Sequence, residues 1–273
     1  MKKHYTSILS NGFGVFASKA FPKPVQKIVN NGYVKLMGLD MSEFNAPSSY
    51  PTLNKLFTRS FREEKKIEDD EKVMISPVDA LVTDFGEILE HTAYQIKGME
   101  YNIAELFGEH HQEAAQSMNR GQYVNLYLSP KDYHRYHTPD KLTIKSLTHI
   151  PGKLYPVNFP LLRNKKNLFI ENERVIIECL DRQGRTFVMV LVGALNVGKM
   201  LVTFEENINT NSNIREPQHY TYDNLTLEKG ELFGWFEMGS TILLFSQKNT
   251  YTPNLRINQK VKFSEPIGAI RVK

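Results

Sequence analysis

The chain has 273 residues and a mass of 31.5 kDa, and 41% of the residues are hydrophobic. This composition can fill a large buried core and excludes an intrinsically disordered protein. The lone cysteine, Cys179, cannot form an internal disulfide. The fold therefore does not depend on an oxidising compartment, and an intracellular location fits best.

The net charge of +4 is concentrated at the start of the chain. Residues 1–40 contain six lysines against Asp40 alone, which gives +5, so the remaining 233 residues sum to −1. A basic leader indicates an anionic partner, either phospholipid headgroups or nucleic acid. We expect no nucleic acid, because a nucleic-acid platform interleaves basic and aromatic residues, whereas the basic excess here is confined to the leader.

Apolar residues of this leader follow helical spacing in two stretches, from Tyr5 to Ala20 and from Val25 to Leu36. Two short amphipathic helices suit either docking on a membrane or packing on the main domain. No uninterrupted apolar stretch reaches the roughly 18 residues that a spanning helix needs. The segment after Lys2 and Lys3 lacks the apolar core and cleavage site of a signal peptide, so we expect peripheral attachment without export.

Beyond the leader, residues 53–61 have helical periodicity, and the charged run 62–72 is typical of a solvated connection. From Val73 onward, short β-branched and aromatic segments alternate with turns, which predicts antiparallel strands, with helices at 101–107 and 112–118. The predicted class is α+β. A helical, basic and amphipathic N-terminal segment (1–62), a candidate for membrane docking, precedes a mainly antiparallel β domain (63–273). Five of the expected strands are 123–128, 174–180, 186–192, 201–204 and 241–246.

Two histidines lie close together in the segment from Ser129 to His137. Ser129 and Pro130 are typical of a helix start, which would put His134 and His137 on one helical face. Two imidazoles so placed can serve as acid and base, and they can also bind a metal, although one HxxH without a third ligand is weak support. Without further context, surface or hydrogen-bonded core histidines are the commoner explanation.

Two other polar clusters have ordinary structural explanations. Asp79 follows a proline turn before an expected strand at 81–84, where an aspartate usually bonds to nearby backbone. Beside a histidine, the same carboxylate could orient the ring. Gly239 and Ser240 precede another strand and are typical of a tight turn, but a glycine also leaves its carbonyl open to attack by a neighbouring hydroxyl.

At this glycine–serine pair the sequence resembles the phosphatidylserine decarboxylase family. Met-Gly-Ser-Thr at 238–241 matches the family's self-cleavage motif, with methionine where leucine is usual, and Ala80 stands where glycine or serine is usual. The ordered combination of matches covers nearly the whole chain beyond residue 50. The other matching segments are FTRSFRE (57–63), SPVDA (76–80), KGMEYNIAELFG (97–108), LSPKDYHRYHTP (128–139), GKLYPVN (152–158), LFIENERV (168–175) and VGALNVG (192–198).

The resemblance implies that Asp79, His137 and Ser240 form a self-processing triad, with His137 as base and Asp79 orienting it. Ser240 would attack the Gly239 carbonyl and end as a covalent pyruvoyl group, the cofactor, so that cleavage gives a large β chain (1–239) and a small α chain (240–273) that carries this group. No metal is implied. The pyruvoyl carbonyl would form a Schiff base with phosphatidylserine and promote loss of carbon dioxide, and His134 is the candidate proton donor. The product would be phosphatidylethanolamine.

The lipid substrate favours the membrane interpretation of the leader and predicts peripheral attachment to the cytoplasmic side of the cell membrane, at an anionic surface. Members of the family commonly associate, so the resemblance also implies a homodimer. Two alternatives stay open at this point. One is a related decarboxylase of another serine lipid or of an amino acid, and the other is a noncatalytic membrane-binding β protein in which the Gly239–Ser240 bond stays intact.

Overall fold

The computed structural model describes residues 14–272 apart from 97–98, 158, 196–198, 209, 213 and 238–240. The helices are α2 (Lys23–Met37), η1 (Pro47–Ser49), α3 (Leu53–Phe57), α4 (Ile103–Phe107), η2 (Glu109–His111), α5 (Gln112–Ser117), α6 (Phe159–Asn164) and α7 (Leu168–Glu171), and residues 14–18 are also helical. The strands are β1 (Val73–Ile75), β2 (Ala80–Glu87), β3 (Thr92–Ile96), β4 (Met99–Asn102), β5 (Gln122–Tyr127), β6 (Arg135–His137), β7 (Leu142–Ile150), β8 (Arg174–Leu180), β9 (Thr186–Val192), β10 (Met200–Val202), β11 (Gln218–Leu227), β12 (Leu232–Phe236), β13 (Thr241–Ser246), β14 (Tyr251–Pro253), β15 (Lys260–Val261) and β16 (Pro266–Ile270).

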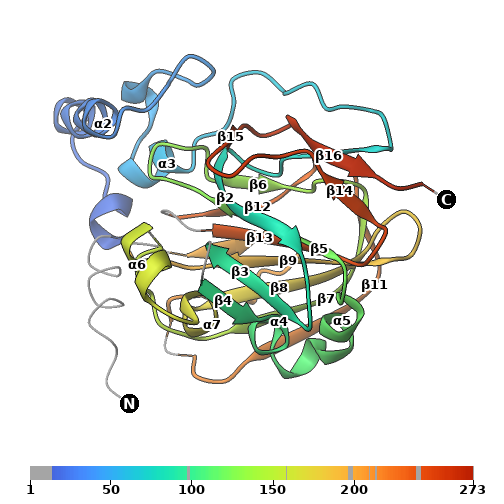
Figure 1. Cartoon of the computed structure of the whole chain (residues 1–273). Coiled ribbons are helices and arrows are strands. Elements are labelled where there is room, and N and C mark those ends of the chain that lie inside the picture. The colour runs from blue at the N-terminus through green and yellow to red at the C-terminus, as the bar shows by residue number, and fades with distance from the viewer. Residues whose placement is uncertain are drawn as a thin grey trace.

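An eight-stranded antiparallel sheet forms the centre of the molecule, in the order β11-β7-β8-β9-β13-β5-β2-β15 (Figure 1). Smaller sheets join β10, β12 and β6, then β1, β16 and β14, and finally β3 and β4. The mainly antiparallel β architecture with added helices is therefore confirmed. Among the helices that the structure describes, none is long and apolar enough to cross a bilayer.

Strand β13 lies between β9 and β5, and all six of its residues are buried. Its apolar residues Ile242, Leu243, Leu244 and Phe245 are at most 2% exposed. Burying four such side chains contributes about 6–12 kcal/mol, as an upper estimate. The strand that follows residue 240 is thus part of the centre of the core.

The predicted strands at 174–180, 186–192 and 241–246 are confirmed with the expected ends. The helix predicted at 53–61 is shorter, because α3 stops at Phe57. Beyond it, the chain turns so that the buried Arg59 guanidinium donates to the carbonyls of Lys131 and Asp132. The helix predicted at 101–107 begins two residues late, since Asn102 ends β4 and its side chain caps α4.

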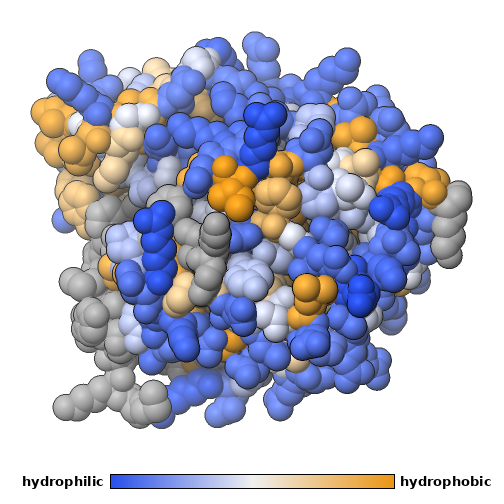
Figure 2. Space-filling view, viewed as in Figure 1, coloured by the Kyte–Doolittle hydropathy of each residue, from blue (hydrophilic) through white to orange (hydrophobic). Residues whose placement is uncertain are grey.

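Helix α2 confirms the second predicted leader helix and lies at the periphery of the molecule beside α3 (Figure 1). Its buried residues are Gln26, Asn30 and Tyr33. Gln26 donates to Asn30, and Asn30 donates to the carbonyls of Pro47 and Tyr50, while Tyr33 belongs to an apolar cluster with residues of α3. Its exposed apolar residues are Val25, Ile28, Leu36 and Met37. Figure 2 shows apolar surface at the upper left, where α2 lies in Figure 1. Most of the first predicted stripe, residues 5–13, lies outside the described residues.

Candidate active site

The two histidines lie at the start and end of a short extended segment, and the helix predicted there is wrong. Ser129 and Asp132 close a turn, in which the Ser129 N–H and hydroxyl each donate to Asp132 Oδ2 over 2.7 Å. The chain then extends into β6, which pairs with β12. Pairing with β12 supplies the backbone hydrogen bonds that a helix would have formed within itself. For example, the Phe236 N–H donates to the His134 carbonyl.

His137 is held in one neutral tautomer. Its Nδ1 lies 2.9 Å from the carbonyl oxygen of Gly230, which can only accept, so Nδ1 carries the hydrogen. Nε2 therefore has a free lone pair and accepts from the Tyr133 hydroxyl, 3.0 Å away. Burial lowers the pKa of His137 to about 4, while the Gly230 carbonyl raises it and the charge of Arg135 lowers it. At neutral pH this ring is a base with its proton-accepting nitrogen defined.

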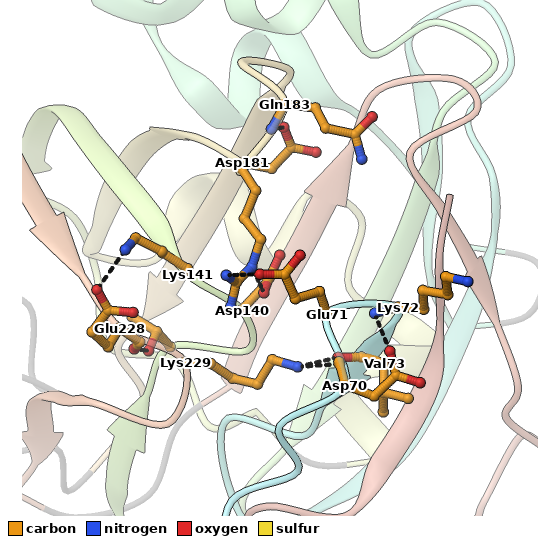
Figure 3. Close-up of polar contacts among 12 residues, drawn as sticks. Asp70, Glu71, Lys72, Val73, Asp140, Lys141, Asp181, Gln183, Glu228 and Lys229 are labelled. Carbon is orange, nitrogen blue, oxygen red and sulfur yellow. Dashed lines mark hydrogen bonds and ion pairs between the residues drawn. The ribbon is translucent and has the colours of Figure 1, made fainter. Parts of the chain in front are cut away.

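The turn that presents the Gly230 carbonyl is itself anchored. Gly230 has φ +77°, in the left-handed region that favours glycine, and an added Cβ would lie 2.7 Å from Ile67. The neighbouring Lys229 Nζ donates to the carbonyls of Asp70 (2.7 Å) and Val73 (2.8 Å), as Figure 3 shows. These contacts fix the carbonyl that orients His137.

Asp79 reaches His137 through an intermediate residue. The Phe263 N–H donates to Asp79 Oδ1 over 2.8 Å, and the Phe263 ring stacks on His137 with centroids 3.8 Å apart. Within the described part of the chain, no direct hydrogen bond joins Asp79 to His137. Burial raises the pKa of Asp79 to about 6; the Phe263 N–H opposes this shift and the charge of Asp132 adds to it.

His134 is fully buried against Phe57 of α3, with ring centroids 4.0 Å apart. Its Nδ1 donates to the Asp132 carbonyl over 2.8 Å, so the lone pair is on Nε2. Nε2 has no hydrogen-bond partner among the described residues. Burial lowers the pKa of His134 to about 3, with the Asp132 carbonyl opposing. A buried, unpartnered acceptor of this kind is typical of a site that receives a ligand.

Gly239 and Ser240 lie outside the described residues, so the geometry of the predicted triad at Ser240 stays a prediction. The residues on either side are described. The Glu237 N–H donates to the Lys199 carbonyl, and Thr241 pairs with Tyr127 and Val192 as the first residue of β13. In the sequence, the bond between 239 and 240 falls between β12 and β13. Strand β12 pairs with β6, which carries His137, and β13 belongs to the large sheet.

A cavity of about 460 Å³ opens beside His137. The charged run that was expected to be only a solvated connection forms one of its walls, from Ser60 to Ile67. Tyr133, Arg135 and Phe263 also line the cavity. Its size suits a small polar headgroup.

The sequence did not reveal the roles of Tyr133, Gly230, Phe263 and Arg59. Tyr133 and Arg59 lie in segments already singled out, whereas Gly230 and Phe263 are distant in sequence from the His137 ring that they contact. Arg59 is 2% exposed, and its Nε and Nη1 have no partner among the described residues. Only its place in the FTRSFRE segment could have indicated that it matters.

Asp79→Asn tests the cost of the buried carboxylate, in the Ser240→Ala background so that the chain stays whole. Because the folded pKa of about 6 lies above the ordinary 3.8, this carboxyl's contribution to stability is fully present below about pH 4 and is lost as pH rises through 6. We expect the free energy of unfolding of the Asp79→Asn variant, relative to that of its Asp79 parent, to rise by up to about 3 kcal/mol as the pH rises from 4 to 7. Urea unfolding at four pH values measures it.

Asp223→Asn is the matched control, since it removes the same charge from an exposed position on β11. Its effect on the free energy of unfolding should change much less over this range. If the difference in unfolding free energy between Asp79→Asn and its parent stays constant from pH 4 to pH 7, the burial cost is contradicted.

Comparison with known proteins places the chain in a family. The sequence model described as phosphatidylserine decarboxylase matches residues 53–269. The chain is 44% identical over 260 residues to a phosphatidylserine decarboxylase proenzyme of Campylobacter jejuni (94% of this chain, 96% of the relative) and 45% identical over 264 residues to one of Helicobacter pylori (96% and 97%). A relative from Myxococcus xanthus with the same name is 35% identical over 268 residues (97% and 94%). This chain belongs to the phosphatidylserine decarboxylase family of decarboxylases.

Proposed function

We propose that this protein is a proenzyme that cleaves itself between Gly239 and Ser240 and then decarboxylates phosphatidylserine to phosphatidylethanolamine. The observation that carries the proposal is the neutral tautomer of His137, whose Nε2 lone pair faces away from the Gly230 carbonyl that fixes it. A serine hydroxyl needs such a base to become a nucleophile at neutral pH.

In self-processing, Ser240 Oγ attacks the Gly239 carbonyl and its proton passes to His137 Nε2. In the structure the Tyr133 hydroxyl donates to that nitrogen. For the transfer, this hydroxyl has to move away from His137 Nε2 or pass the proton on to it. The peptide bond becomes an ester, and elimination releases the Gly239 carboxylate. Hydrolysis of the resulting dehydroalanine gives ammonia and a pyruvoyl group on residue 240. Asp79 supports this step through Phe263, which stacks on the His137 ring.

The pyruvoyl group supplies a carbonyl that condenses with the substrate amine and withdraws electrons as carbon dioxide leaves. The unpartnered Nε2 of His134 fits a site that must handle a substrate proton. Since this nitrogen carries a lone pair, His134 first takes a proton from the substrate's ammonium group. It returns that proton to the substrate carbon after carbon dioxide has left.

The position of β13 supports two chains that stay together after cleavage. The α chain would begin with β13, which pairs on both sides with strands of the β chain, while β15 pairs with β2 and β16 with β1. The fragments would therefore separate only when the protein unfolds.

Docking on an anionic membrane is the proposed role of the leader. The buried face of α2 carries Gln26, Asn30 and Tyr33, while Ile28 and Leu36 are 74% and 79% exposed. Packing on the domain therefore leaves these two apolar side chains uncovered, and they suit the interface of a bilayer on the cytoplasmic side.

Intact masses under denaturing conditions test self-cleavage. We expect two chains from the wild type and one from Ser240→Ala, because only the hydroxyl can attack the peptide. The small chain has 273 − 239 = 34 residues, or about 3.9 kDa at this protein's mean residue mass. Its pyruvoyl end should react with hydrazines. A wild-type chain that stays whole and unlabelled after prolonged incubation would favour a noncatalytic membrane-binding protein.

The two histidines should separate the two reactions. His137→Gln should remain uncleaved, because it lacks the base. His134→Gln should still cleave but decarboxylate phosphatidylserine about 100-fold or more slowly, because general acid–base catalysis is worth that much. Carbon dioxide release per cleaved chain measures the second effect. Equal cleavage in both variants, or full turnover by His134→Gln, would contradict these roles.

Substitution on α2 tests membrane docking. The double variant Ile28→Ser/Leu36→Ser should weaken binding to vesicles containing anionic lipid by about 10-fold or more, because it removes two exposed apolar side chains. Asn31→Ser is the control on an exposed position of the same helix and should change binding by less than about twofold. Vesicle sedimentation measures both, and unchanged binding of the double variant would exclude this surface.

A further inference from the structure

Arg135 shares the cavity wall with His137 because of the strand that carries them both. In an extended strand, residues two apart project from the same face, so Arg135 and His137 lie together while Tyr136 points into the core. Both side chains line the cavity of about 460 Å³. A cation is thus placed next to the proposed base.

The Arg135 guanidinium is positioned but not neutralised. Its Nε donates to the Thr58 carbonyl over 2.9 Å, and its Cζ lies 5.6 Å from the centre of the Trp235 ring. Among the described residues no carboxylate pairs with it, whereas Lys65 of the same cavity is paired with Glu43. A held arginine with unpaired outer nitrogens is suited to bidentate binding of an oxyanion.

We propose that Arg135 binds the phosphodiester of the serine headgroup. This inference rests on the proposed decarboxylase function and adds the subsite that positions the lipid. Phosphatidylserine has two anionic groups, the carboxylate and the phosphodiester. Decarboxylation removes the carboxylate charge, so a cation bound to that carboxylate would stabilise the starting state more than the transition state and would slow the reaction. The phosphodiester keeps its charge throughout and can remain bound to Arg135 from substrate to product.

The other charged groups of the cavity do not replace Arg135. Arg62, Glu63 and Glu64 are exposed, and solvent screens their charges. Lys65 is engaged by Glu43. Arg135 is the cation of this cavity that adjoins His137 on the same strand.

The test measures binding and turnover with the cleaved full-length protein. Glycerophosphoethanolamine carries the phosphodiester without the carboxylate, and serine carries the carboxylate without the phosphate. For Arg135→Gln we expect the Kd of glycerophosphoethanolamine and the KM of phosphatidylserine in detergent micelles to rise about 10- to 100-fold, the usual range for a lost charge-assisted hydrogen-bonded pair. Serine binding and kcat should change by less than about threefold. Calorimetry measures the Kd values.

Arg135→Lys keeps the charge without the bidentate geometry, so it should raise the Kd of glycerophosphoethanolamine by only about 3- to 10-fold. This variant serves as the test if Arg135→Gln does not fold. Arg256→Gln, on the exposed loop before β15, should match the wild type. Thermal melting and intact mass verify folding and cleavage in each variant.

Three outcomes would overturn the inference. Weaker serine binding with unchanged glycerophosphoethanolamine would assign Arg135 to the carboxylate. Inorganic phosphate that binds as tightly as glycerophosphoethanolamine would indicate a free-anion site. An equal loss in Arg62→Gln would mean that the net charge of the cavity, and not Arg135, attracts the headgroup. A wild type that binds glycerophosphoethanolamine through Arg135 but releases no carbon dioxide would instead refute the proposed function and leave the anion subsite standing.

Discussion

The pairing of β13 with both β9 and β5 is the constraint on which the rest of the structure depends. It fixes Thr241, the second residue after the proposed cleavage site, at the centre of the large sheet. On the other side, β12 is held by β6, which carries His137. The described residues on either side of the proposed cleavage site are thus held in two different sheets. Such restraint favours a defined approach of nucleophile and base over a flexible one.

The proposed catalytic groups are held in a state that disfavours charge. Burial raises the pKa of Asp79 to about 6 and lowers the pKa of His137 to about 4, so each is kept closer to its neutral form than in water. Perturbed groups clustered beside a cavity are typical of functional sites, where stability is sacrificed for reactivity. The anchoring of Gly230 through Lys229 explains why His137 stays ordered despite this cost.

The leader and the cavity together suit the proposed action on a lipid at a membrane surface. Helix α2 packs on the protein through Asn30 and Tyr33 and leaves Ile28 and Leu36 exposed. A headgroup, unlike the acyl chains, is small enough for the cavity beside Arg135. Under this proposal the acyl chains remain in the membrane while the polar end of the lipid enters the protein.

The sequence by itself determined the family and the main strands. Segments 174–180, 186–192 and 241–246 were predicted with their observed ends, because strands buried on both faces appear as uninterrupted runs of apolar, often β-branched residues. Only the tertiary structure decided which carbonyl fixes the tautomer of His137, since Gly230 is 93 residues away in sequence. It also replaced the predicted helix at 129–137 by a turn and a strand, because pairing with β12 outweighed local capping preferences. The apolar pattern of a segment indicates whether it is buried, whereas the hydrogen-bond partners within a site depend on how strands distant in sequence pack together.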